Sequence, residues 1–136
     1  MQCIEKSFKI SSTKRNEFID ITQKVEEFVK SSKIEVGDVI VYCPHTTAAI
    51  TINENADPDV VHDLLHTLER LIPHKDSSYL HGEGNSDAHL KSSLIGVSER
   101  IIIKDGAMQL GTWQGIYFCE FDGPRGRSVL LQIRGE

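Results

Sequence analysis

The feature that most constrains the fold is the pattern of residues 57–73, which predicts one long helix in a chain that otherwise favours strands. Asp57 is a favourable N-cap, Pro58 suits the first helical position, and Asp59 lies in the positive first turn. Pro73 ends the pattern. Six apolar residues fall on one helical face: Val61, Leu64, Leu65, Leu68, Leu71 and Ile72.

Most other apolar residues alternate with polar ones or form short β-branched runs, which predicts strands. The predicted strands are 4–10, 17–21, 38–43, 45–54, 99–104, 107–110, 116–121 and 128–133. The first two are expected to pair as a hairpin around a turn at 11–15. Asp105 and Gly106 signal another sharp hairpin.

Two further helices are predicted. One follows Thr22, whose side chain suits an N-cap, and carries Val25, Phe28 and Val29 as a narrow apolar stripe. The other is short, covers residues 88–95 and is expected to be capped by Asp87. Strands and helices in this order predict an α+β fold with a mostly antiparallel sheet.

Length and charge narrow the class of protein. A chain of 136 residues without repeat or linker is expected to form one domain, residues 1–136. The net charge of −5 argues against a nucleic-acid partner. The three cysteines are widely spaced, which indicates neither a disulfide framework nor a zinc ribbon. No apolar run approaches membrane-spanning length, so we expect a cytoplasmic protein.

Residues 79–94 are rich in small polar groups and favour an exposed loop, where chemistry is often located. His81, Glu83, Asp87 and His89 offer imidazole and carboxylate ligands for a divalent metal. The alternative is a solvated turn, because the spacing of the two histidines matches no standard metal motif. His45 follows Pro44 at the start of a predicted strand and is either a ligand or base, or a histidine bonded to a local carbonyl.

Three other stretches are candidates for binding a metal or a ligand. His62 and His66 are four residues apart on the long helix and can chelate zinc, but we interpret them as exposed histidines at the edge of its apolar face. The glycine-flanked residues 111–115 allow close approach of an anion or a flat ring. The turn at 122–127 carries arginines, which bind phosphate in a bidentate manner, although a solvated turn is the simpler alternative.

Taken together, four motifs resemble the signatures of the YjbQ-like family, and the resemblance covers nearly the whole chain. They are His45–Glu54, His81–His89 with Lys91–Ser93, Leu110–Phe118 and Glu120–Arg125. The resemblance implies a two-sheet β-sandwich with two main helices and a short third, which associates as a homotrimer. It also implies thiamine-phosphate synthase activity, in which hydroxymethylpyrimidine diphosphate is joined to thiazole phosphate and diphosphate is released.

The requirements of this reaction can be matched to residues of the four motifs. Loss of diphosphate requires neutralisation of the leaving group, usually by a metal ion and an arginine. We expect His45, His81 and His89 to bind one metal, either zinc or magnesium. Glu54, Asp87 and Gln114 are the predicted catalytic groups, and Trp113 or Tyr117 the wall for the pyrimidine. The residues expected to bind phosphate or substrate are Thr46, Thr47, Lys91, Ser92, Ser93, Thr112 and Arg125.

Two other functions remain open from the sequence. One is a metal-dependent hydrolase of a small phosphorylated or acyl substrate, with Glu54 or Asp87 as base. The other is a non-enzymatic trimer that binds a metabolite. We also expect a threefold assembly to favour sites between subunits.

Overall fold

Eight strands and three helices make up the chain, and the computed structural model describes every residue from 1 to 136. One sheet has five strands in the order β1 (Gln2–Ser11), β8 (Gly126–Gly135), β3 (Val36–Tyr42), β5 (Ser98–Lys104) and β6 (Ala107–Met108). The other has three, in the order β2 (Glu17–Asp20), β7 (Gln114–Glu120) and β4 (Ala48–Glu54). The helices are α1 (Thr22–Ser32), α2 (Pro58–Leu71) and α3 (Ser86–Ile95). Every strand pair is antiparallel, so the predicted α+β class and the two sheets are confirmed.

The main core lies between the two sheets and under α1. Strand β8 sends Val129, Leu131 and Ile133 into it, because alternate side chains point to opposite faces of a strand. Strand β7 is buried on both faces: Ile116 and Phe118 join the main core. Its other face belongs to a second, smaller cluster made by Ala49, Ala88, Tyr117, Cys119 and Phe121. Residues from α3 thus cover the outer face of the three-stranded sheet.

The first two strands do not form the predicted hairpin. Strand β1 pairs with β8 along its whole length, and β2 pairs with β7 in the other sheet. The prediction was wrong because adjacency in sequence favours a hairpin, whereas the partner is chosen by burial against distant strands. The turn between β1 and β2 therefore carries the chain from one sheet to the other.

The helix starts follow the sequence only in part. In α2, the side chain of Asp57 accepts a hydrogen bond from the backbone nitrogen of Asp59 at 2.9 Å, as predicted. In α1, Thr22 is the first helical residue rather than the cap, and Asp20 accepts from its backbone nitrogen at 2.9 Å. In α3, the N-cap is Asn85 and not Asp87. Asp87 was misassigned because its side chain turns inward to an ion pair.

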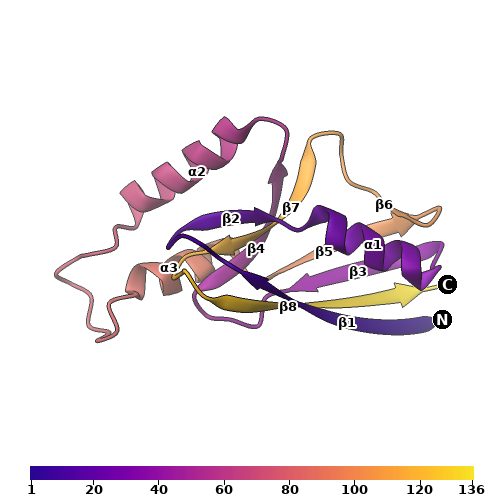
Figure 1. Cartoon of the computed structure of the whole chain (residues 1–136), viewed down its shortest axis with the longest axis horizontal. Helices are drawn as coiled ribbons and strands as arrows, with labels where there is room; N and C mark the ends of the chain where they lie inside the picture. Colours follow the sequence, from indigo (N-terminus) through magenta and orange to yellow (C-terminus); the bar gives the residue numbers. More distant parts are fainter.

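Helix α2 has the predicted apolar stripe, yet none of its residues is buried. Val61 and Leu68 contact the smaller core cluster, while Leu71 is 68 % exposed. Figure 1 shows α2 and α3 at one end of the elongated molecule and both chain termini at the other. No helix is long and apolar enough to span a membrane.

We predict that Gly37→Ala lowers the free energy of unfolding by about 3 kcal/mol or more, measured by urea denaturation, because overpacking that must displace backbone is costly. A Cβ at Gly37 would lie 2.0 Å from the carbonyl oxygen of Arg134, on the paired strand β8. Gly126→Ala is the control, because a Cβ there has no neighbour within 4 Å. Equal stability of the two variants would show that β3 and β8 approach less closely than described.

Candidate functional site

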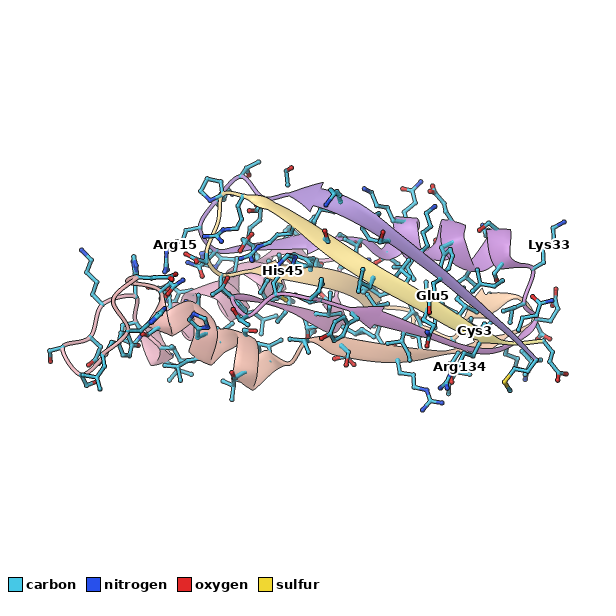
Figure 2. The ribbon with its side chains drawn as sticks, turned by 90° about the horizontal axis from the view of Figure 1, so that it is seen from below. Cys3, Glu5, Arg15, Lys33, His45 and Arg134 are labelled. Carbon is cyan, nitrogen blue, oxygen red and sulfur yellow. The ribbon has the colours of Figure 1, made fainter.

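The three histidines predicted to meet line one cavity, although they come from distant parts of the chain. His45 lies in the connection from β3 to β4, His81 in the loop between α2 and α3, and His89 on α3. The cavity has a volume of about 430 Å³ and no hydrophobic residue in its lining. Its lining residues are Pro44, His45, Thr46, Thr47, His81, Glu83, Asn85, His89, Asp122, Arg125 and Arg127. In Figure 2, His45 and Arg15 lie toward one end of the molecule, away from Cys3, Lys33 and Arg134.

His81 and His89 form the closest pair of imidazoles in the cavity. Their ring centroids are 5.3 Å apart and the ring planes are nearly perpendicular, at 83°. Two imidazoles on one zinc ion place their centroids about 5 Å apart, given zinc–nitrogen bonds near 2 Å. Glu83 is the nearest carboxylate to them, with 3.9 Å between its Oε2 and Nε2 of His81. The separation of the two rings therefore matches that of two imidazoles on one ion.

His45 does not fit as the third ligand. Its Nε2 accepts a hydrogen bond from the backbone nitrogen of Ser128 at 2.9 Å, so the proton of the neutral ring is on Nδ1. A ring in this tautomer has no second lone pair to offer a metal. Burial and the positive charge of Arg127 lower the pKa of His45, which keeps the ring neutral. His45 is thus a hydrogen-bond donor, and no three His, Cys, Asp or Glu side chains group closely enough to hold a metal ion.

Beside the histidines, Arg125 offers free donors. Its Nε donates to the carbonyl oxygen of Asp122 at 2.9 Å, and one terminal nitrogen donates to Oδ2 of Asp122 at 3.1 Å. The other terminal nitrogen has no protein acceptor, and the side chain is half exposed. A guanidinium held in this way can bind an anion with its remaining donors.

Asn85 holds the same carboxylate from the other side. Its Nδ2 donates to Oδ2 of Asp122 at 2.9 Å, so Asp122 is clamped between Asn85 and Arg125. The Oδ1 atom of Asn85 is buried and has no hydrogen-bond partner, although the residue is only 7 % exposed. A buried acceptor without a partner is costly.

A buried ion pair supports the floor of the cavity and was not assigned a role from the sequence. Nε of Arg127 donates to Oε1 of Glu120 at 2.9 Å, and a terminal nitrogen contacts Oε2. Burial opposes ionisation of Glu120, but hydrogen bonds from Arg127 and Ser12 keep its pKa below the ordinary value. Arg127 also donates to Oγ1 of Thr47 at 2.9 Å, and Thr47 is buried. The alternation of β8 could have indicated this, because Arg127 lies two residues before the buried Val129 and so points to the same inward face.

Asp87 and Lys91 were predicted to be a catalytic group and a phosphate ligand, but both are internal ion-pair partners. The two oxygens of Asp87 accept from Arg15 at 2.8 and 2.9 Å, and the side chain is completely buried. Lys91 Nζ lies 2.7 Å from Oε2 of Glu69 and 3.6 Å from Oδ2 of Asp87. Burial would raise the pKa of Asp87, but hydrogen bonding and charge from Arg15 keep it below the ordinary value. Neither residue lines the cavity.

Among the predicted serines and threonines, some are buried and bonded within the protein, whereas others are exposed in a cavity wall. Ser92 is buried and its hydroxyl donates to the carbonyl oxygen of Ala48 at 2.6 Å, which fastens α3 to β4. Ser93 is exposed and lines a neighbouring cavity together with His89. Thr46 is exposed and lines both cavities. Thr46 and Ser93 therefore remain available to a substrate.

Glu54, Gln114 and Thr112 do not line the cavity. Glu54 pairs with Gln114 at the end of β4 opposite to Ala48, which follows the cavity residues. A strand of that length separates the two ends by about 20 Å. The Oε1 atom of Gln114 accepts from the backbone nitrogen of Gly111 at 2.7 Å, and Glu54 accepts from that of Asp57 at 3.3 Å. Both side chains stabilise local turns.

The other predicted participants also lie away from the cavity. Trp113 is 62 % exposed and precedes Gln114 at the far end of β4 and β7. Tyr117 belongs to the smaller core cluster, and its hydroxyl donates to the carbonyl oxygen of Glu54 at 3.0 Å. His62 and His66 are exposed on α2 with parallel rings 6.1 Å apart. None of these residues lines the cavity of His45, His81 and His89.

Comparison with known proteins gives consistent matches. The model of the family described as UPF0047 protein YjbQ-like matches residues 6–136. UPF0047 protein YugU of Bacillus subtilis is 52 % identical over 96 % of this chain and 98 % of its own length. UPF0047 protein MJ1081 of Methanocaldococcus jannaschii is 54 % identical over 95 % and 93 %, respectively.

Solved structures agree with the fold. An uncharacterized conserved protein of the same family from Clostridium acetobutylicum has a TM-score of 0.93 and 51 % identity, covering 95 % of this chain and 99 % of its own. A YbjQ-like protein of unknown function from Sulfolobus solfataricus has a TM-score of 0.95 at 30 % identity, covering 99 % of each chain.

We predict that stability falls in acid through Asp87. Its pKa is lower in the folded protein than in the unfolded chain, so the unfolded chain binds the proton first as the pH falls. The stabilisation is therefore complete above the ordinary aspartate pKa, about 4, and is lost as the pH falls through the folded value. In urea unfolding from pH 7 to pH 3, the free energy of unfolding of Asp87→Asn should be about 3 kcal/mol lower than that of the wild type at pH 7. Below pH 4 it should decline less steeply than that of the wild type. Asp59→Asn, at an exposed site, should keep the wild-type slope; an unchanged slope in Asp87→Asn would contradict the assignment.

A second prediction concerns metal binding. We expect zinc to bind at His81 and His89, and either alanine substitution should weaken binding by about tenfold or more in calorimetric titration, because each removes one of two protein ligands. The double substitution of His62 and His66 by alanine is the matched control, since it removes another close pair of histidines. Magnesium should bind more weakly, because it prefers oxygen ligands. Loss of zinc binding only in the His62 and His66 variant would refute the assignment.

Proposed function

This chain belongs to the YjbQ-like UPF0047 family, and we propose that it is an enzyme that binds a small phosphorylated substrate in the cavity of His45, His81 and His89. The observation that carries the proposal is the convergence of three imidazoles and the free donors of Arg125 on one cavity without hydrophobic lining. Imidazoles exchange protons near neutral pH, and arginine forks bind phosphate. Such a set of groups suits reactions in which a phosphate or diphosphate leaves.

The specific reaction that we propose is of the thiamine-phosphate synthase type. The thiazole attacks the methylene carbon of hydroxymethylpyrimidine diphosphate, a bond to that carbon forms, and the carbon–oxygen bond to diphosphate breaks. Diphosphate leaves with the bonding electron pair, so negative charge grows on its oxygens. Donors that face this charge lower the barrier. Arg125 and the Nδ1 proton of His45 are the donors that the cavity offers.

The remaining parts of the proposal concern the metal and the assembly. A divalent metal at His81 and His89, zinc rather than magnesium, would add positive charge next to the leaving group. A homotrimer is the proposed assembly. Within it, Glu54, Gln114 and Thr112 can act on substrate only if they approach the cavity of a neighbouring subunit, because in their own subunit they lie at the opposite end of β4.

A hydrolase of a small phosphorylated substrate is the second candidate, and the lining of the cavity favours it. A bound pyrimidine calls for an apolar or aromatic wall, yet Trp113 and Tyr117 lie elsewhere and no hydrophobic residue lines the cavity. In a hydrolase, water takes the place of the thiazole. Glu83 is the carboxylate that lies nearest to the imidazoles and is the candidate base.

We predict that the purified protein with zinc forms thiamine phosphate and diphosphate in equal amounts from the two substrates, as measured by chromatography. His81→Ala, His89→Ala and Arg125→Ala should each lower kcat/KM by about 100-fold, because the two histidines would hold the metal beside the departing phosphate and Arg125 would donate to it. Arg70→Ala, an exposed arginine on α2, is the control and should keep the wild-type rate.

The reaction products formed in this assay distinguish the three candidate functions. Release of phosphate or diphosphate from a single substrate, without a second organic substrate, would establish the hydrolase instead. Binding of the substrates with no turnover of either kind would leave the non-enzymatic binding protein as the correct description.

A further inference from the structure

The cavity with the charged groups has a neighbour that shares part of its wall. This second cavity has a volume of about 360 Å³ and is lined by Ser92, Ser93, Gly96 and Val97 together with His45, Thr46 and His89. The last three residues also line the first cavity. We call the first cavity, with Arg125 and Asn85, the charged lobe, and the second the neutral lobe. Thr46 and the two imidazoles form the boundary between them.

We propose that the site takes a phosphate ester in two parts, with the phosphate in the charged lobe and a small uncharged organic group in the neutral lobe. This inference rests on the proposed function and specifies the substrate class. It predicts that the bond between the phosphate and the organic group lies beside His45 and His89. Both lobes have volumes in the range of small-molecule sites, which start near 300 Å³.

One face of α3 and its end build the neutral lobe. His89, Ser92, Ser93 and Gly96 follow the spacing i, i+3, i+4 and i+7, which places them on one side of a helix. Gly96 is the C-cap, with φ of +98°, and a Cβ there would meet no atom within 4 Å. The wall is therefore made of small side chains and leaves room for a group from outside.

The neutral lobe offers no charged partner to a ligand. Apart from the shared imidazoles, its lining contains no ionisable side chain. The Ser92 hydroxyl is already used, since it donates to the carbonyl oxygen of Ala48. Ser93 offers the only additional hydroxyl of this helix face. A charged group would lose its hydration there without gaining a partner, whereas an uncharged one would not.

The charged lobe offers donors to an anionic ligand. The guanidinium of Arg125 keeps donors that no protein atom accepts, and its orientation is set by Asp122. The Nδ1 proton of His45 belongs to a ring whose other nitrogen is already bonded to Ser128. A phosphate monoester matches these groups, because its oxygens accept from Arg125 and His45.

Two ligands test the division of the site. Inorganic phosphate occupies the charged lobe only, whereas phenyl phosphate also fills the neutral lobe. Ser93→Phe places a ring in the neutral lobe and should weaken phenyl phosphate by about tenfold or more while leaving inorganic phosphate unchanged, both measured by calorimetry. Arg125→Ala should weaken both ligands by at least about tenfold.

Two further variants test whether the loss of binding comes from removal of the Ser93 hydroxyl or from a general effect of an added aromatic ring. Ser93→Ala removes the hydroxyl without filling the lobe and should weaken phenyl phosphate much less than Ser93→Phe does. Ser77→Phe places the same ring on the exposed loop between α2 and α3 and should change neither affinity. Thermal unfolding of each variant shows whether it is folded, and Ser93 is exposed without a hydrogen-bond partner, so folding should be retained.

The outcomes are distinct. If Ser93→Phe weakens both ligands equally, or neither, the division into two lobes is wrong while the phosphate site of the proposed function stands. If the wild-type protein binds neither ligand, the phosphate site fails and the inference fails with it. Selective loss of phenyl phosphate in Ser93→Phe, with both ligands lost in Arg125→Ala, is the result we expect.

Discussion

The ion pair between Arg127 and Glu120 is the interaction on which the site depends, because it joins chain segments from both sheets. Arg127 begins the inward face of β8 in the five-stranded sheet, and Glu120 ends β7 in the other. Ser12 donates to Glu120 at 2.7 Å, and Thr47 accepts from Arg127. Taking two charges out of water is expensive, and only a fully hydrogen-bonded arrangement offsets that cost. The pair therefore defines where the β3–β4 connection and the β7–β8 turn lie, and these carry His45 and Arg125.

A second buried network does the same for the helical side of the cavity. Arg15 comes from the connection between β1 and β2, Asp87 and Lys91 from α3, and Glu69 from α2. Helix α2 has no buried residue of its own, so its attachment relies on Glu69 as well as on the half-covered apolar stripe. The charges of this network are satisfied internally and are not offered to a substrate. His89 lies between Asp87 and Lys91 on α3, and His81 lies in the loop that precedes this helix.

The sequence predicts local structure better than it predicts which strands pair and which side chains form ion pairs. Period-two alternation identified most strands, and the Asp57–Pro58 cap identified α2, because both depend on neighbours in sequence. The hairpin of β1 and β2 was wrong, since each strand pairs with a partner about 100 residues away, as in Phe18 opposite Cys119. Convergence of the histidines was predicted from the family resemblance and not from their spacing. The ion pairs of Asp87 and Lys91 were not predicted, because their partners, Arg15 and Glu69, are distant in sequence.

The assignment of roles in the cavity depends on hydrogen bonds that no sequence pattern reveals. His45, His81 and His89 are chemically identical side chains, yet the backbone of Ser128 occupies one nitrogen of His45 and so makes it a donor. His81 and His89 have no comparable backbone bond and keep the lone pairs that a metal or a proton transfer needs. His45, Arg125 and the pair of His81 and His89 line the same cavity. A cavity that combines anion donors with proton acceptors is suited to a substrate whose phosphate must be held while another part of it reacts.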